Sequence, residues 1–129
     1  MKPKQKLYEE KLTREIIGAC IEVHRALGPG LLESAYQICV CRELQLRGIS
    51  FESQKPLPLE YKGVRLDCGY RLDILVAQLV LIEIKAVEAL APIHEAQMLT
   101  YLRLTGVRVG LLMNFHEPVL KSGIRRLVL

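Results

Sequence analysis

Apolar side chains recur at helical spacing in three parts of the chain. Between residues 7 and 27 they form one stripe, which consists of Ile16, Ile17, Cys20, Ile21 and Leu27. This spacing predicts a helix, which the following Gly-Pro-Gly would end, because glycine suits a helix C-terminus and proline cannot continue a helix. The same pattern predicts a second helix over residues 31–47 and a third over residues 92–106.

The remaining apolar segments have the length and composition of β-strands. They cover residues 49–61, 64–76, 79–86, 107–115 and 124–129. Pro56 and Pro58 favour an edge or irregular strand for the first segment, and Gly69 favours a bulge or bend in the second. The order of elements predicts an α/β sandwich, in which helices flank a mixed sheet with a central antiparallel hairpin.

Composition limits the kind of protein this chain can be. Its 129 residues fit a single domain, with residues 1–6 as a basic N-terminal segment that could be mobile, and the 50% hydrophobic content excludes a disordered chain. No apolar run approaches the roughly 20 residues that span a bilayer, and the N-terminus lacks the apolar region of a secretory signal. We therefore expect a cytoplasmic protein with no membrane partner.

The four cysteines and the net charge add little to this picture. The cysteines contain no CxxC pair, so we expect reduced and mostly buried thiols rather than a zinc site. A net charge of +4 permits an anionic partner such as nucleic acid but does not require one.

The stretch from residue 70 to residue 87 places three ionisable side chains, Asp73, Glu83 and Lys85, among leucine, isoleucine and valine. In a strand over residues 79–86, Glu83 and Lys85 point to one face. Asp73 reaches the same face of an antiparallel hairpin only if the connection has an odd number of residues or a bulge shifts the register. We therefore predict a three- or five-residue connection around residues 77–79.

Two interpretations of these three side chains are open. Two neighbouring carboxylates, with the backbone carbonyl of Ile84 between Glu83 and Lys85, are oxygen ligands that favour Mg²⁺ or Mn²⁺ over zinc. With a metal there, Lys85 could hold an attacking water or neutralise a phosphate, as phosphodiester hydrolysis requires. The alternative is a buried salt bridge between Lys85 and the acids, although two acids and one lysine leave an unbalanced charge.

Two further acids are weaker candidates from the residues alone. Glu33 falls in the first turn of the second predicted helix, where the helix dipole by itself favours a carboxylate. Asp67 has the same strand parity as Asp73 if no bulge intervenes, but its less apolar neighbours favour a solvated position.

An acid followed about ten residues later by E-x-K, here Asp73 and Glu83-Ile84-Lys85, resembles the motif of the PD-(D/E)XK nuclease superfamily. The sequence GLLESAY at residues 30–36 resembles the G-x-x-E-x-x-Y signature of the GxxExxY proteins within that superfamily. QMLTY at residues 97–101 resembles the Q-x-x-x-Y element of its exonuclease branch. The resemblance covers residues 12–129, although Leu72 replaces the proline of the superfamily motif.

The resemblance implies a restriction-endonuclease-like fold and assigns roles to particular residues. Asp73 and Glu83 would bind the metal, and Lys85 would serve the water. Glu33 would contact the metal directly or through water, and Gln97 and Tyr101 would face the same cleft from the third helix. His24 lies within the matching stretch, but a satisfied histidine at a helix end is the commoner case, and His94 and His116 are weaker candidates still.

Together these features predict metal-dependent phosphodiester hydrolysis of nucleic acid, with DNA the expected substrate. Arg42, Arg71, Arg103 and Arg108 are available for phosphate contacts. The alternative is a catalytically inactive module that keeps the nuclease fold to bind nucleic acid or a protein partner. The small size leaves room for a homo-oligomer or a protein partner.

Overall fold

The computed structural model of the chain describes residues 3–129. Within them the elements follow in the order α1 (Pro3–Leu27), α2 (Glu33–Leu46), β1 (Phe51–Pro56), β2 (Leu59–Tyr61), β3 (Val64–Leu66), β4 (Arg71–Val76), β5 (Val80–Lys85), α3 (Pro92–Thr105), β6 (Val109–Asn114), a 3₁₀ turn (Leu120–Gly123) and β7 (Ile124–Val128). The predicted helices are confirmed to within a few residues. Of the basic N-terminal segment, residues 1 and 2 lie outside the described part, and residues 3–6 belong to α1.

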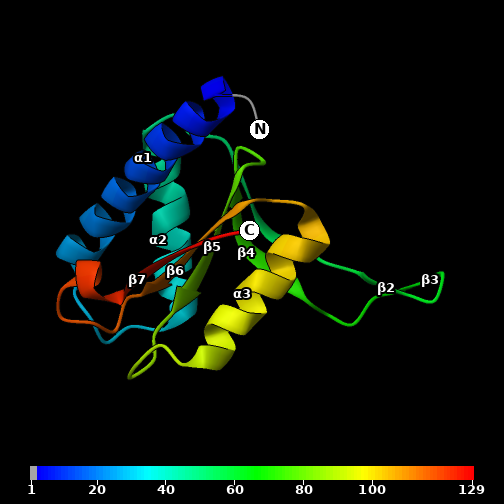
Figure 1. The fold of residues 1–129 in the computed structure, drawn as a ribbon. Coiled ribbons are helices and arrows are strands. Elements are labelled where there is room, and N and C mark those ends of the chain that lie inside the picture. The colour runs from blue at the N-terminus through cyan, green and yellow to red at the C-terminus, as the bar shows by residue number, and fades with distance from the viewer. Residues whose placement is uncertain (1–2) are drawn as a thin grey trace.

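Five strands form one mixed sheet in the order β1-β4-β5-β6-β7 (Figure 1). All neighbouring pairs are antiparallel except β5 and β6, which are parallel because α3 crosses between them. The proline-containing β1 lies at an edge, as predicted. The central antiparallel hairpin is β4–β5, and it occupies the middle of the sheet.

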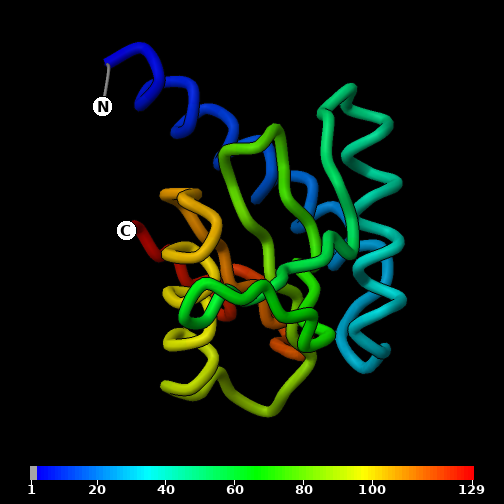
Figure 2. The backbone as a smooth tube through the Cα atoms, turned by 90° about the vertical axis from the view of Figure 1, so that its right-hand side faces the viewer, coloured from blue at the N-terminus to red at the C-terminus, as the bar shows by residue number. Residues whose placement is uncertain are grey.

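Helices cover both faces of this sheet, with α1 and α2 on one side and α3 on the other (Figures 1 and 2). Strand alternation divides the core in two. Ile82 and Ile84 pack with α1 and α2, whereas Leu81 packs with Met98 and Leu102 of α3. Glu83 and Lys85 share the parity of Leu81, so both belong to the α3 side of the sheet, as the sequence predicted.

The connection between β4 and β5 has the predicted length. Val76 pairs with Val80, so three residues, Ala77, Gln78 and Leu79, join the strands. Ala77 and Gln78 adopt φ values of 50° and 60°, and the N–H of Leu79 donates to the carbonyl of Val76 at 2.9 Å. The odd number of residues places side chains of equal parity on the same face of the hairpin.

The segment over residues 64–76, predicted as one strand with a bulge or bend at Gly69, is divided into two strands, because the chain turns fully in its middle. Oδ1 of Asp67 accepts a hydrogen bond from the N–H of Gly69 at 2.9 Å, and Gly69 has φ 78°. This local turn separates β3, which pairs with β2 in a hairpin of its own, from β4. The β2–β3 hairpin extends away from the body of the protein (Figure 1).

The remaining expectations concern the cysteines and the membrane. All four cysteines are free thiols, but only Cys20 is buried, and Cys68 is exposed, so the expectation of mostly buried thiols was wrong. Burial raises the pKa of the Cys20 thiol to about 12. Within residues 3–129, no helix is long and apolar enough to cross a bilayer.

Candidate active site

The β-ladders on both sides of β4 are interrupted at Asp73. On one side Ser53 pairs with Ile74 and Lys55 with Leu72, but Gln54 between them adopts φ 52°. On the other side the pairing with β5 ends at Ile74 and Ile82. The backbone of Asp73 must therefore find other hydrogen-bond partners.

The Glu83 side chain supplies one of these partners, and the Asp73 carboxylate in turn bonds the backbone of β5. The N–H of Asp73 donates to Oε2 of Glu83 at 2.8 Å, and the N–H of Ile84 donates to Oδ2 of Asp73 at 2.8 Å. Each carboxylate thus bonds the backbone of the opposite strand. The arrangement fixes Asp73 and Glu83 side by side at the point where β4 and β5 separate.

Helix α2 also contributes a hydrogen bond to the backbone of Asp73. Nε2 of Gln37 donates to the carbonyl of Asp73 at 3.2 Å, and Nε2 of Gln54 donates to Oε1 of Gln37 at 2.9 Å. Gln37 follows Glu33 by four positions, so one turn of α2 places both side chains toward the end of the hairpin.

Glu33 is the first residue of α2, and a turn that Tyr36 stabilises positions it. The buried Tyr36 ring stacks on Phe115 with centroids 4.6 Å apart. Its hydroxyl donates to the carbonyl of Gly28 and accepts from the N–H of Leu31. Oε2 of Glu33 then accepts from the N–H of Ala86 at 3.2 Å, just beyond β5. The tyrosine of the G-x-x-E-x-x-Y stretch therefore acts on the fold, and the glutamate lies toward the site.

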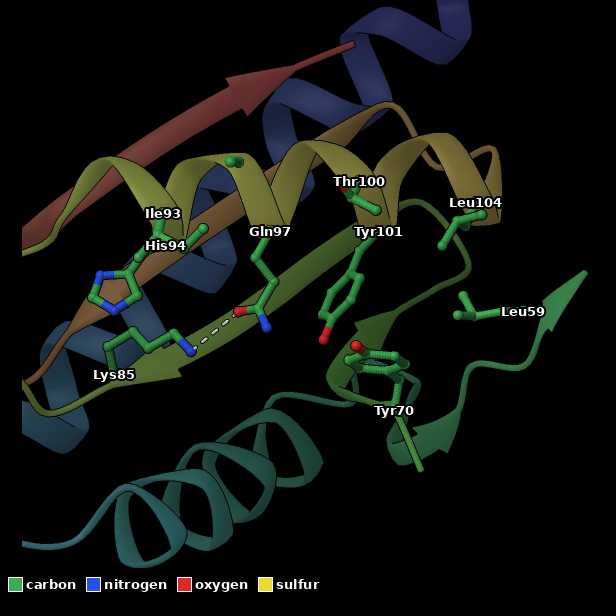
Figure 3. A pocket seen from close by; sticks show the side chains of 10 residues that line it. Leu59, Tyr70, Lys85, Ile93, His94, Gln97, Thr100, Tyr101 and Leu104 are labelled. Atoms are coloured by element: carbon green, nitrogen blue, oxygen red, sulfur yellow. Dashed lines mark hydrogen bonds between the residues drawn. The ribbon is translucent and has the colours of Figure 1, made fainter. Parts of the chain in front are cut away.

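Lys85 connects the sheet to α3. Its Nζ lies 3.5 Å from Oε1 of Gln97, at the outer limit of a hydrogen bond (Figure 3). Within residues 3–129, Lys85 forms no ion pair with Asp73 or Glu83, although its charge lowers the pKa of both. The buried salt bridge considered as an alternative is therefore wrong.

Burial and charge repulsion raise the pKa of both Asp73 and Glu83. Desolvation raises the pKa of Glu83 to about 8, and the neighbouring Asp73 adds to the effect. Desolvation also raises the pKa of Asp73, against the opposing effect of the Ile84 N–H. The pKa of the Tyr101 hydroxyl is raised too, first by desolvation and then by the charge of Glu83. A bound cation would relieve this accumulation of negative charge.

The acids fit a hard cation that keeps part of its water shell. Among residues 3–129, no three His, Cys, Asp or Glu side chains are grouped closely enough to hold an ion by themselves. Glu33 is near enough to raise the pKa of both Asp73 and Glu83, but it does not join them as a third close ligand. Because Mg²⁺ is usually bound by one or two carboxylates and several waters, the pair is a sufficient protein contribution.

Helix α3 carries the rest of the site. Gln97 and Tyr101 lie one turn apart and face the same side as His94, as the sequence predicted from their spacing. Nδ1 of His94 accepts from the N–H of Ala91 at 2.9 Å, which leaves Nε2 as the protonated nitrogen of a neutral ring. Figure 3 shows His94, Gln97 and Tyr101 pointing from α3 toward Lys85 and Tyr70.

Two residues near the site escaped sequence reasoning. Tyr70 precedes β4 and meets Tyr101 edge to face, with centroids 6.2 Å apart. Asn114, fully buried at the end of β6, receives a hydrogen bond from the N–H of Val87 and donates to its carbonyl at 2.9 Å. It fixes the chain immediately after Lys85. Asn114 can be connected with the site only through the parallel pairing of β5 with β6, which places it opposite Lys85. The sequence alone does not reveal that pairing.

Other candidates lie away from the acids or have structural roles. Asp67 is exposed in the turn before β4, as the solvated interpretation expected. His24 is buried beside Phe115, and its Nε2 lies 2.8 Å from the carbonyl oxygen of Glu117. His116 is exposed.

Comparison with known families agrees with this geometry. The sequence model of the PD-(D/E)XK nuclease superfamily matches residues 10–127, which is nearly the whole chain. The chain belongs to the PD-(D/E)XK nuclease superfamily. Its five-stranded mixed sheet with flanking helices is the restriction-endonuclease-like fold, so that expectation is confirmed. Nucleases of this PD-(D/E)XK superfamily typically use divalent metal ions, which is consistent with the paired acids of β4 and β5. Comparisons with curated proteins and with solved structures give no match.

Proposed function

We propose that this PD-(D/E)XK protein hydrolyses phosphodiester bonds of nucleic acid, with DNA as substrate and Mg²⁺ or Mn²⁺ as cofactor. The observation that supports the proposal most directly is a pair of hydrogen bonds across the hairpin, from the N–H of Asp73 to the Glu83 carboxylate and from the N–H of Ile84 to the Asp73 carboxylate. Lys85 lies on the same face of β5 as Glu83. Two neighbouring buried carboxylates cost free energy when they are ionised without a cation, so simple packing does not explain why they occur here.

Each residue has a role in the proposed reaction. Asp73, Glu83 and the carbonyl of Ile84 would hold the metal, and Glu33 would contact it directly or through water. The metal, when bound, polarises the phosphate and lowers the pKa of water. Lys85 orients the attacking water or neutralises charge that develops on the phosphate. Gln97 keeps the Lys85 amine in position, and Tyr101 lies beside it on α3.

The assignment to the GxxExxY group is part of the same proposal. Its support is the local structure of residues 30–36, in which Gly30 adopts φ 105°, Tyr36 fixes the turn and Glu33 begins α2. This explains physically why a glycine, a glutamate and a tyrosine occur at this spacing.

A nucleic-acid substrate is supported by the positive net charge and by exposed arginines on the elements that carry the site. Arg71 begins β4 and Arg103 lies on α3, and both are exposed. Phosphate contacts of this kind make binding depend on salt concentration.

Purified protein should cleave labelled single- or double-stranded DNA in the presence of Mg²⁺ or Mn²⁺, and chelation should stop the reaction. Lys85→Ala should abolish cleavage and leave the circular dichroism spectrum unchanged. Lys121→Ala, which removes an exposed lysine of the 3₁₀ turn, is the matched control and should retain cleavage. Cleavage that survives both Lys85→Ala and Asp73→Ala would come from a contaminant and would refute the proposal.

The second candidate function is a nuclease-fold module that binds nucleic acid without cutting it. It differs from the first only in the absence of turnover, since the same acids and lysine would be present. Salt-dependent DNA binding with no cleavage under any divalent ion would favour this alternative.

A further inference from the structure

A pocket of about 530 Å³ lies beside Lys85, between α3 and the segment that leads from β2 to β4. This is within the range of about 300–1,000 Å³ that is typical of small-ligand sites. Ten residues line it: Leu59, Tyr70, Lys85, Ile93, His94, Ala96, Gln97, Thr100, Tyr101 and Leu104. Figure 3 shows Lys85 at one end of the pocket and Tyr70, Leu59 and Leu104 at the other.

The chemistry of this lining is unlike that of a phosphate groove. Lys85 is its only permanently charged side chain, and most of the remaining surface is apolar. Ile93 and Leu104 are large apolar side chains that remain 70% and 47% exposed at its rim. A surface of this kind beside a catalytic amine suits an apolar, flat part of a ligand rather than a chain of phosphates.

Two tyrosines give the pocket its shape. Tyr101 as a whole residue is 6% exposed, whereas Tyr70 is 43% exposed, and the two rings meet edge to face. Tyr70 therefore offers an open aromatic surface that a buried neighbour holds in place. Aromatic rings on this type of platform stack with nucleic-acid bases of any sequence.

The end of the pocket near Lys85 also has the polar side chains of Gln97 and His94. The Nε2–H of His94 can donate to an oxygen or nitrogen atom of a bound group, because Nδ1 of His94 is already bonded. The Gln97 side chain contacts Lys85 through Oε1 and also forms a hydrogen bond with the Tyr101 side chain. A ligand with a phosphate near Lys85 and a base near Tyr70 would satisfy both ends of the pocket.

We propose that this pocket binds one unpaired base of the nucleic-acid strand, from the nucleotide next to the phosphate at Lys85. This inference rests on the proposed nuclease function and narrows its substrate to single strands or frayed ends. A base inside a duplex is stacked and paired, so it reaches such a pocket only after leaving the stack, which costs a few kcal/mol. A strand that is already unpaired enters without this cost.

Binding can be measured without turnover, by fluorescence anisotropy in EDTA. The probes are a labelled 12-residue oligothymidylate, the same backbone made entirely of abasic sites, and a blunt duplex of equal length. The oligothymidylate should bind about tenfold more tightly than the abasic strand, because a base stacked on an aromatic side chain contributes on that order to affinity. Equal affinity for these two strands, or tighter binding of the duplex, would overturn the proposal.

Variants of Tyr70 connect the effect to the pocket. Tyr70→Ala should weaken oligothymidylate binding about tenfold and leave the abasic strand unaffected, whereas Tyr70→Phe should keep the preference. Tyr8→Ala is the matched control, because Tyr8 is a half-exposed tyrosine on α1, which covers the opposite face of the sheet. If Tyr70→Ala weakens both strands equally, Tyr70 does not bind a base and the proposal fails.

Cleavage assays separate this inference from the proposed function. Suppose that the protein cuts DNA with Mg²⁺, but that single abasic substitutions along the strand and Tyr70→Ala leave the rate unchanged. The nuclease function then stands and the base pocket is refuted. Conversely, base-dependent binding that requires Tyr70, without cleavage, supports the pocket and refutes the nuclease function.

Discussion

The amine of Lys85 on β5 lies 3.5 Å from the amide oxygen of Gln97 on α3. This contact joins the sheet to the helix that crosses its face, and among residues 3–129 the amine forms no ion pair with Asp73 or Glu83. A neutral partner leaves the lysine charge available for a phosphate, whereas a carboxylate partner would have neutralised it.

Gln97→Ala should therefore reduce the cleavage rate about tenfold and leave stability almost unchanged, because the side chain is half-buried and its contact is long. Steady-state cleavage and thermal unfolding should be measured together. Gln45→Ala, which removes an exposed glutamine of α2, is the matched control. A loss of melting temperature that accounts for the lost activity would argue against a positioning role.

The metal-free protein should become less stable as the pH rises. The pKa of Glu83 is raised from 4.5 to about 8. The folded state thus keeps a proton that the unfolded chain releases, and this stabilisation is complete below about pH 4.5 and lost as the pH passes about 8. The raised pKa of Asp73 acts in the same direction.

Thermal unfolding in EDTA tests this, and the wild type should lose several degrees between about pH 6 and about pH 9. Glu83→Gln removes the titrating group and keeps its shape, so it should show a clearly smaller loss. An identical pH dependence in both proteins would mean that Glu83 is not the group responsible.

Mg²⁺ or Mn²⁺ should stabilise the folded protein through the two acids. At a hundred times its dissociation constant, a ligand adds about 2.7 kcal/mol to the free energy of unfolding. The effect should grow with pH because the ligands must lose their protons to bind. Asp73→Asn and Glu83→Gln should abolish it, and Asp67→Asn, in the exposed turn before β4, should keep it. Stabilisation that survives in both site variants would locate the ion elsewhere.

Tyr36→Phe should show that the tyrosine of the G-x-x-E-x-x-Y stretch acts through Glu33. The substitution removes the hydroxyl that bonds Gly28 and Leu31, at a cost of about 1 kcal/mol, and leaves the stacking on Phe115. Cleavage should fall together with stability. Glu33→Gln should lower cleavage without lowering the melting temperature, since Glu33 is exposed. The reverse pattern in either variant would contradict this division of roles.

The faces of the central hairpin could be predicted from sequence because strand alternation has a fixed period. Once Asp73 and Glu83 were placed on neighbouring strands, parity alone required an odd connection, and the structure has three residues there. The stripe of Gln97 and Tyr101 along α3 followed from helical spacing in the same way.

What escaped prediction depends on contacts between distant parts of the chain. The interruption of the β-ladders at Asp73 is accompanied by the left-handed backbone of Gln54 and by a hydrogen bond from the side chain of Gln37, and neither feature has a local sequence pattern. The separate β2–β3 hairpin was missed because a local hydrogen bond, from the N–H of Gly69 to the Asp67 carboxylate, turns the chain inside an apparently continuous strand.

The three-residue connection between β4 and β5 also restricts how this gene can change. Surface loops generally accept insertions and deletions with little effect. Here a single added or removed codon at residues 77–79 would rotate one acid to the opposite face of the sheet, whereas a change of two codons would preserve the alignment. Functional lineages should therefore vary in length at this loop by even numbers, unless a bulge elsewhere in the hairpin restores the phase.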